Sequence, residues 1–198
     1  LIDIHKTWVT SGGQRGQQLD LSDYDMRKLK SMRMEILTAI KAVNTKFIGM
    51  NLYKIQLQSA VLDQSDFRSC NMEEADMRGA SLRQAQMNHA NLRYADMSGL
   101  LFHTKDKQRF SPCNMEEAYL RYADLHGAIM RNANLSGADL AYADLRYADL
   151  SEADLRRANL EGALFENAVM VKTKLDEGKQ PEKIASMEVL RTEEDVSD

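Results

Sequence analysis

The side chains that most often carry enzyme chemistry are few in this chain and widely spaced. Its four histidines lack the spacing of a metal site, and they are His5, His89, His103 and His126. Gly12-Gly13-x-x-Gly16 does not follow an apolar strand, so it is not a phosphate-binding or dinucleotide-binding loop. We therefore predict no catalytic residue, no bound metal and no cofactor, in a protein that is not an enzyme.

The elements that must position the other side chains follow a period of five residues. From Phe47 to Phe102 a Leu, Met or Phe recurs at every fifth position, and the series resumes from Met115 to Met170. Two residues before each of these central residues (position i) stands a small one, and 17 of the 21 alanines occupy that place. A period of five fits neither a helix nor a long flat strand. It indicates a short extended segment followed by a corner.

Positions i and i−2 are alternate residues of an extended segment, so both point to the same side. Because one is large and the other small, the interior that they line has to be narrow. Cys70 and Cys113 take the small inward position, so we expect buried, inert thiols. The most regular predicted core positions are Ala138, Leu140, Ala143, Leu145, Ala148, Leu150, Ala153 and Leu155.

Glycine and proline agree with this pattern. Six of the ten glycines stand two residues after a central residue, where the chain has to turn and a positive φ is useful. Neither Pro112 nor Pro181 lies within a repeat tract. Proline has no N–H to donate to a neighbouring coil, so its absence from the tracts is expected of a stacked ladder.

The tandem motif Ala-[Asp/Asn]-Leu-x-x resembles the pentapeptide repeat family, and residues 138–155 show it most cleanly. The match covers residues 47–102 and 113–172. The resemblance implies an all-β solenoid, a right-handed quadrilateral β-helix in which four pentapeptides make one coil. We expect short helical caps at one or both ends, because an open coil edge invites strand addition.

The N-terminal cap is predicted to be a helix with Leu1, Ile4 and Trp8 on one face, stopped by Gly12-Gly13. The central residues at 21 and 47 differ in phase by one residue, so an irregularity lies between them. The predicted segments are 1–18 (cap helix and Gly-rich turn), 19–46 (degenerate first repeats), 47–102 (first tract), 103–112 (extruded loop), 113–175 (second tract) and 176–198 (C-terminal cap helix and acidic tail).

A coil of four pentapeptides places some carboxylates above one another, namely Asp124 with Asp144 and Asp76 with Asp96. Two interpretations are open, a cation site or solvated carboxylates that also bond the local backbone. The same count places Arg93 over Glu73, a surface pair that stabilises by about 0–1 kcal/mol.

Exposed aromatic and basic residues form the candidate partner surface. Tyr122 and Tyr142 take the same corner on successive coils, with Tyr147 one side further on. Such a row serves an interface or is ordinary cross-strand packing, and both remain open. The surface as a whole comprises Tyr122, Tyr142, Tyr147 and, from the loop, Lys105, Lys107, Arg109 and Phe110.

Composition and charge limit the class of protein. With 43% apolar and 28% charged residues the chain is neither disordered nor collagen-like. We see no transmembrane run, no signal peptide and, with two cysteines, no disulfide framework, so we expect a cytoplasmic protein. The net charge of −4 is uneven, at +3 for residues 1–46, +1 for 47–112, −5 for 113–170 and −3 for 171–198.

The first functional hypothesis is a non-catalytic scaffold rod that binds a protein, with direct nucleic-acid binding and membrane binding not expected. The family resemblance supplies an alternative, a DNA-mimicking modulator of DNA gyrase of the quinolone-resistance type, and also a homodimer through the C-terminal element. A second alternative is an accessory fragment of a larger multidomain protein.

The register itself can be tested by mutation. Ala143→Phe should overpack the narrow interior and lower the free energy of unfolding by about 1–3 kcal/mol. Leu145→Ala should lower it by about 2–5 kcal/mol through a cavity. Thermal melts of both variants measure this, and an Ala143→Phe protein that melts like the parent would mean that residue 143 points outward.

Overall fold

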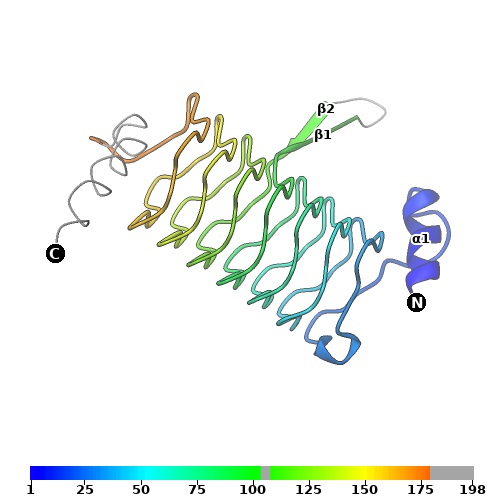
Figure 1. Ribbon diagram of the computed structural model, residues 1–198. Helices are drawn as coiled ribbons and strands as arrows, with labels where there is room; N and C mark the ends of the chain where they lie inside the picture. The colour runs from blue at the N-terminus through cyan, green and yellow to red at the C-terminus, as the bar shows by residue number, and fades with distance from the viewer. Residues whose placement is uncertain (104–107, 179–198) are drawn as a thin grey trace.

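The computed structural model describes residues 1–103 and 108–178, which form one rod (Figure 1). The backbone coils around the long axis, and parallel bridges join each coil to the next. Along most of the rod the bridged residues are 20 positions apart, as in Asn71 with Asn91. The bridges form four series offset by five residues, so each coil has four sides of one pentapeptide each. The predicted four-sided β-helix is thus confirmed in its repeat, while its right-handed winding stays a prediction.

The repeat around Leu145 shows how the coils are joined. The N–H of Asp144 donates to a carbonyl of the preceding coil, at 3.0 Å. The N–H groups of Leu145 and Tyr147 donate to carbonyls of the following coil, at 2.8 and 3.0 Å. The N–H of Ala148 donates to the Leu145 carbonyl and closes the corner. Four of the five N–H groups of a repeat are therefore satisfied by backbone alone, which suits a backbone that turns once in every repeat.

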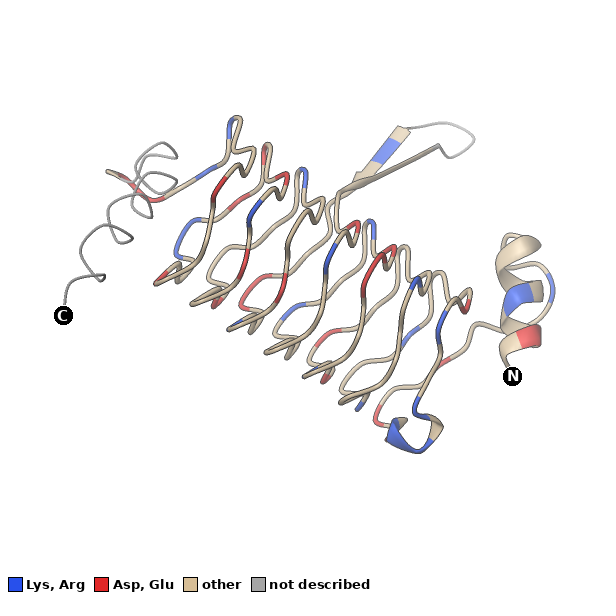
Figure 2. Ribbon diagram, in the orientation of Figure 1, with Lys and Arg blue, Asp and Glu red and all other residues tan. Residues whose placement is uncertain are grey.

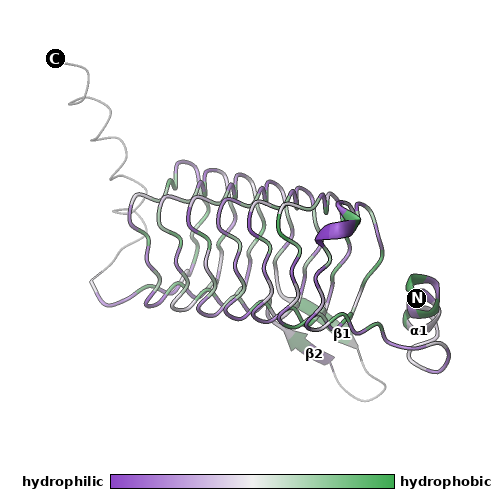
Figure 3. Cartoon of the chain, turned by 90° about the horizontal axis from the view of Figure 1, so that it is seen from below, coloured by the Kyte–Doolittle hydropathy of each residue, from purple (hydrophilic) through white to green (hydrophobic). Residues whose placement is uncertain are grey.

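The interior is a narrow apolar column. From Leu62 to Leu155 every inward residue of the rod is at most 2% exposed. The eight core positions named from the sequence, between 138 and 155, are at most 1% exposed. Near the N-terminal end Phe47 and Phe67 take the same inward place on successive coils, and their rings stack at 4.8 Å. Green, hydrophobic stretches recur at the same places in successive coils in Figure 3.

The corner position i+2 adopts the left-handed conformation throughout the rod. Its φ lies between 52° and 69° at every repeat whose central residue is one of residues 32–92 or 115–170, and at the repeat of Leu21. Glycine marks some of these corners, but most are held by ordinary residues, among them Tyr94, Tyr122, Tyr142 and Tyr147. Such a φ is uncommon for a side chain other than glycine and costs on the order of 1 kcal/mol, which the ladder has to offset.

Residues 19–46 form coils that are bridged like the rest, apart from one corner. Asp20 is bridged to Lys41, whereas Ser31 is bridged to Asn51, so the spacing is longer by one position in the first pair. The extra residue lies in the corner occupied by the 3₁₀ helix η1 (Arg27–Leu29). This corner accounts for the change of phase between the central residues at 21 and 47.

Helix α1 (Ile2–Thr10) lies at the N-terminal end of the rod (Figure 1). The sequence predicted that Leu1, Ile4 and Trp8 form the inner face of this cap. This prediction is wrong for two of the three, because Leu1 is 86% and Ile4 49% exposed. Ile2 packs against the core instead, and His5 is fully buried. His5 occupies the buried position where an apolar residue was expected, because its two ring nitrogens form hydrogen bonds with backbone groups of the rod.

Gly16 in the turn after α1 has to be glycine. Its φ is +79°, and a Cβ there would lie 2.3 Å from the Ile4 carbonyl oxygen and 2.7 Å from the Trp8 nitrogen. The chain therefore passes directly against the helix backbone on its way to the first coil.

A hairpin interrupts the rod where the sequence predicted a loop at 103–112. Strands β1 (Leu100–His103) and β2 (Gln108–Ser111) pair antiparallel and project from the rod (Figure 1). Across this insertion the bridged partners are 33 positions apart instead of 20, as in Ser81 with Asn114. Phe102 was predicted as the last central residue of the first tract, which is wrong. It is 38% exposed in β1, because the chain leaves the rod after Gly99.

The predicted C-terminal cap helix lies outside the described residues from position 179 on. Among the described residues, no helix has the length and apolar character needed to cross a membrane.

The docking of α1 should weaken in acid. His5 Nε2 lies 3.0 Å from the Thr38 carbonyl and donates to it, while Nδ1 accepts the Leu19 N–H, so the ring is neutral. Burial lowers the pKa of His5 below its usual value, although the bond to Thr38 opposes this. Because the folded pKa is lowered, this stabilisation is complete above about pH 6.5 and declines as the pH falls below it.

Melting temperatures measured between pH 7.5 and 5.5 should therefore fall more steeply for the parent than for His5→Gln. The glutamine has an amide donor and acceptor but does not titrate. Parallel slopes for the parent and His5→Gln would contradict the assignment.

Candidate functional site

The residues considered for enzyme chemistry do not come together. No group of three or more His, Cys, Asp or Glu within residues 1–103 and 108–178 is placed to hold a metal ion. Cys70 and Cys113 are buried in the column, and burial raises the pKa of both thiols to about 12. A thiol with so high a pKa is a poor nucleophile at neutral pH.

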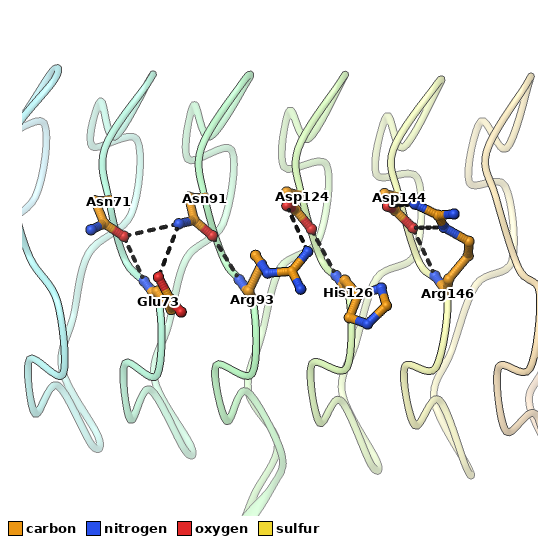
Figure 4. Close-up of polar contacts among 8 residues, drawn as sticks. All are labelled: Asn71, Glu73, Asn91, Arg93, Asp124, His126, Asp144 and Arg146. Atoms are coloured by element: carbon orange, nitrogen blue, oxygen red, sulfur yellow. Dashed lines mark hydrogen bonds and ion pairs between the residues drawn. The ribbon is translucent and has the colours of Figure 1, made fainter.

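The acidic and amide side chains before the central residues complete the backbone bonding. The fifth N–H of a repeat, that of residue i+1, has no place in the ladder. Figure 4 shows the side chain of residue i−1 accepting it at 3.1 to 3.2 Å in four successive coils, in the pairs Asn71 with Glu73, Asn91 with Arg93, Asp124 with His126 and Asp144 with Arg146. Of the two interpretations of the stacked carboxylates, the structure shows bonding to the local backbone.

Arginines bind the remaining oxygens of these carboxylates. Arg146 donates from Nε and Nη2 to Asp144, at 2.9 and 2.7 Å. Its side-chain hydrogen bond is the main reason why the pKa of Asp144 lies below the usual value. Arg93 pairs with Asp124 on the next coil, at 3.2 Å, and not with Glu73 as the sequence count suggested.

The acidic tract is therefore largely paired. Blue and red segments lie side by side along the rod in Figure 2. Further ion pairs join Arg121 with Asp139, Arg131 with Asp149 and Arg156 with Asp154. Since the arginines neutralise these aspartates locally, the charge of −5 in residues 113–170 does not appear as an unbroken row of free carboxylates.

One side of the rod collects aromatic side chains in two rows. In the first row Tyr122 and Tyr142 stack with ring centroids 5.2 Å apart, and His89 stacks on Tyr122 at 5.1 Å. The Arg121 guanidinium lies 5.8 and 5.7 Å from the two tyrosine rings. The Tyr142 hydroxyl donates to Glu161, at 2.9 Å.

The second row lies at the next corner. The His126 ring meets Tyr94 edge to face at 5.9 Å and Tyr147 at 5.1 Å. A Cβ at Gly127 would lie 2.6 Å from the Tyr94 ring, so glycine leaves room for this tyrosine to lie across the corner. We call the surface formed by residues 89–94, 122–127 and 142–147 the tyrosine side.

The tyrosine side shares part of the composition of protein interfaces. Its four tyrosines remain 42% to 55% exposed although their rings are packed against neighbours. The three ranges that define it contain no Lys and no Glu. Protein interfaces are enriched in Tyr and Arg and depleted in Lys and Glu, and Tyr and Arg dominate their hot spots.

The structure brings some of the predicted surface residues together and separates others. Tyr122, Tyr142 and Tyr147 share the tyrosine side. Arg109 and Phe110 lie on β2 of the hairpin, which leaves the rod at another corner, and Lys105 and Lys107 lie outside the described residues. The sequence did not join His89 and His126 to the tyrosines, because the spacing of bridged partners changes from 20 to 33 positions at the hairpin.

Comparison with known proteins identifies the repeat. Residues 43–79, 70–102, 109–137 and 133–170 match the family model for pentapeptide repeats, in eight copies. No curated protein sequence matches the chain.

Several solved structures with this kind of repeat are similar to this chain. HetL, a pentapeptide repeat protein involved in heterocyst differentiation regulation in the cyanobacterium Nostoc sp. strain PCC 7120, is 21% identical over 88% of this chain and 96% of its own, with a TM-score of 0.29. Full-length QnrB1, a plasmid-mediated fluoroquinolone resistance protein, is 19% identical over 89% and 98%, with a TM-score of 0.28. A pentapeptide repeat protein from the Arabidopsis thaliana thylakoid lumen is 27% identical over 52% and 59%, with a TM-score of 0.31.

The side chain at position i−1 should matter as an acceptor more than as a charge. Asp144→Ala removes the acceptor of the Arg146 N–H and should lower the free energy of unfolding by about 1–3 kcal/mol. Asp144→Asn keeps an acceptor and loses only a partly exposed ion pair, about 0–1 kcal/mol. Urea unfolding measures both, with Glu166→Ala on the same side as the control. Equal losses for the Ala and Asn variants would contradict the bonding scheme.

Proposed function

The chain belongs to the pentapeptide repeat family, and on that basis we propose that it is a non-catalytic rod that binds another protein through the tyrosine side. The observation that carries the proposal is the gathering of four exposed tyrosines, two histidines and two arginines on one side of three successive coils. The β-helix requires only that side chains at these outward positions be compatible with water. The presence of aromatic residues there is therefore not explained by the fold.

The rigidity of the rod supports this proposal. Each aromatic side chain contacts a neighbouring ring, by stacking in the first row and by edge-to-face or tilted contacts in the second. The corner backbone beneath these side chains is bonded to both adjacent coils. Tyrosine also has few rotatable bonds, so little conformational entropy is lost when a partner docks.

The lack of a catalytic role is supported by what the reactive groups are doing. The carboxylates of Asp124 and Asp144 are engaged with backbone N–H groups and arginines, and both thiols lie in the apolar column. None of them is presented to a substrate.

The second candidate function is modulation of DNA gyrase by DNA mimicry. The hairpin that projects from the rod and the acidic second tract favour it. The paired aspartates favour it less, because duplex DNA presents phosphates at regular intervals without cations fixed beside them. A supercoiling assay decides this alternative, and inhibition of gyrase at micromolar protein would favour it over the scaffold.

Site-specific crosslinking in the native host tests the tyrosine side. A photoreactive phenylalanine placed at Tyr122, Tyr142 or Tyr147 should crosslink the same protein partner. The matched control is Tyr119, which is 47% exposed but points from the neighbouring side of the rod, and it should give no such product. Crosslinking of equal yield from Tyr119, or none from the other three positions, would contradict the proposal.

Once the partner is recovered, the contribution of each tyrosine to the binding free energy can be measured. Tyr142→Ala should weaken its binding by about 2 kcal/mol or more, roughly 30-fold, as expected of a central tyrosine. Tyr119→Ala should leave the dissociation constant within about twofold. A C-terminal homodimer remains a prediction of the family resemblance, and the mass of the protein in solution tests it.

A further inference from the structure

The hairpin β1–β2 is an addition that the rod does not need. The coils before and after it are bridged in all four series, for example Ser81 to Asn114 and Asp96 to Ile129. Hydrogen bonding continues across the insertion, as from the Leu82 N–H to the Asn114 carbonyl at 2.7 Å. The hairpin therefore stands outside the ladder and leaves the stacking of the coils intact.

The base of the hairpin is fitted to two glycine corners. A Cβ at Gly99 would lie 2.1 Å from the Phe110 ring, and a Cβ at Gly79 would lie 2.8 Å from the Leu100 Cβ. The Ser111 hydroxyl also donates to the Gly79 carbonyl, at 3.3 Å. These contacts set the direction in which the hairpin leaves the rod.

The hairpin exposes apolar side chains that the rest of the fold keeps inside. Of the five phenylalanines, Phe47, Phe67 and Phe165 are at most 3% exposed, whereas Phe102 is 38% and Phe110 is 52% exposed. Leu101, the cross-strand partner of Phe110, is 51% exposed. Leu101 and Phe110 therefore form an exposed apolar pair on one face of the hairpin, while Phe102 lies beside Arg109 on the other face. Exposed apolar side chains gathered on a projecting element are typical of an interaction site.

The hairpin also carries an exposed cation. Arg109 is exposed beside its cross-strand partner Phe102, and it makes no ion pair within the described part of the chain. Many other arginines of the rod, such as Arg68, Arg78 and Arg146, are paired with an aspartate. A carboxylate from a partner would therefore complement Arg109.

The backbone of the hairpin offers a place for such a partner. The sheet has two strands, so the outer edge of β2 has no third strand beside it among the described residues. An edge of this kind binds an extended segment through main-chain hydrogen bonds, and the side chains next to it confer specificity.

We propose that the outer edge of β2 binds an extended segment of a partner protein by strand addition, with an apolar residue beside Phe110 and an acidic residue beside Arg109. Residues 109 and 110 are consecutive and point to opposite faces of the sheet. The complementary residues of the added strand are therefore also consecutive, an acidic residue next to an apolar one.

This site goes beyond the tyrosine side and does not depend on it. A rod that bound its partners only through the tyrosine side would keep all of its binding if the hairpin were removed. A second copy of the chain is the less favoured occupant, because two short strands bury much less than the roughly 1,200–2,000 Å² of a stable protein interface.

Peptide selection tests the proposal directly. A displayed library of random dodecamer peptides is selected on the full chain. The enriched peptides should contain an acidic residue next to an apolar one. Arg109→Glu should weaken their binding at least about tenfold, a change of about 1.4 kcal/mol, and a new selection on this variant should yield Lys or Arg in place of the acidic residue. Arg157→Glu, at an exposed corner of the same rod, is the charge-reversal control and should bind the first peptides unchanged.

Two further measurements separate strand addition from other binding. Deletion of residues 100–112 joins Gly99 to Cys113 and restores the spacing of 20 positions between bridged partners, so the variant should melt as a folded rod by circular dichroism yet bind none of the peptides. In an enriched peptide, N-methylation should abolish binding at alternate residues and be tolerated at those between.

Four outcomes would overturn the proposal. They are equal binding by the deletion variant, an equal loss with Arg157→Glu, N-methylation that is tolerated at every residue, and a selection that enriches no peptide. A chain that dimerises in solution and becomes monomeric when residues 100–112 are deleted would assign the edge to a second copy instead. Loss of binding at the tyrosine side in the crosslinking experiment would leave these results unaffected.

Discussion

A backbone that turns once in every pentapeptide has to find a partner for each N–H group, and the rest of this structure depends on how it does so. In the repeat around Leu145, two N–H groups reach the following coil, one reaches the preceding coil and one closes the corner. The fifth belongs to Arg146 and is taken by the Asp144 side chain. Because an unpaired N–H costs free energy wherever water is partly excluded, the residue before the central one tends to be Asp or Asn.

The same constraint explains the strain that the rod carries. Closing a corner with a bond from Ala148 to Leu145 places Tyr147 at a φ of 60°, and most other corners adopt a similar conformation without glycine. Each such corner is unfavourable by itself. It persists because the bonds to both neighbouring coils and the buried Ala–Leu column hold it from three directions, which also makes the outer surface rigid.

A rigid lattice leaves the outward positions free to serve other purposes. The ladder uses backbone and the side chain of residue i−1, and the column uses residues i and i−2. The side chains at positions i+1 and i+2 have only to be compatible with water and, at i+2, with a positive φ. The aromatic residues of the tyrosine side and the exposed phenylalanines of the hairpin exceed that requirement, and for this reason they carry the functional proposals.

The amino-acid sequence by itself determined the period and the identity of the inward side chains, and its resemblance to the family indicated that four repeats make a coil. These features depend on contacts within a repeat or between repeats at constant spacing, which leave a regular pattern in the sequence. It also placed the thiols of Cys70 and Cys113 in the column. Tertiary structure alone decided which outward residues meet.

The hairpin inserted between Gly99 and Cys113 changes the sequence separation of bridged partners from 20 to 33 positions, and the contacts of His89 with Tyr122 and of His126 with Tyr94 lie across it. Counting along a regular repeat does not find these pairs, because the insertion changes the spacing between partners. Tertiary structure likewise decided that His5 anchors α1, since that contact joins residues 33 positions apart through backbone groups that leave no pattern in the sequence.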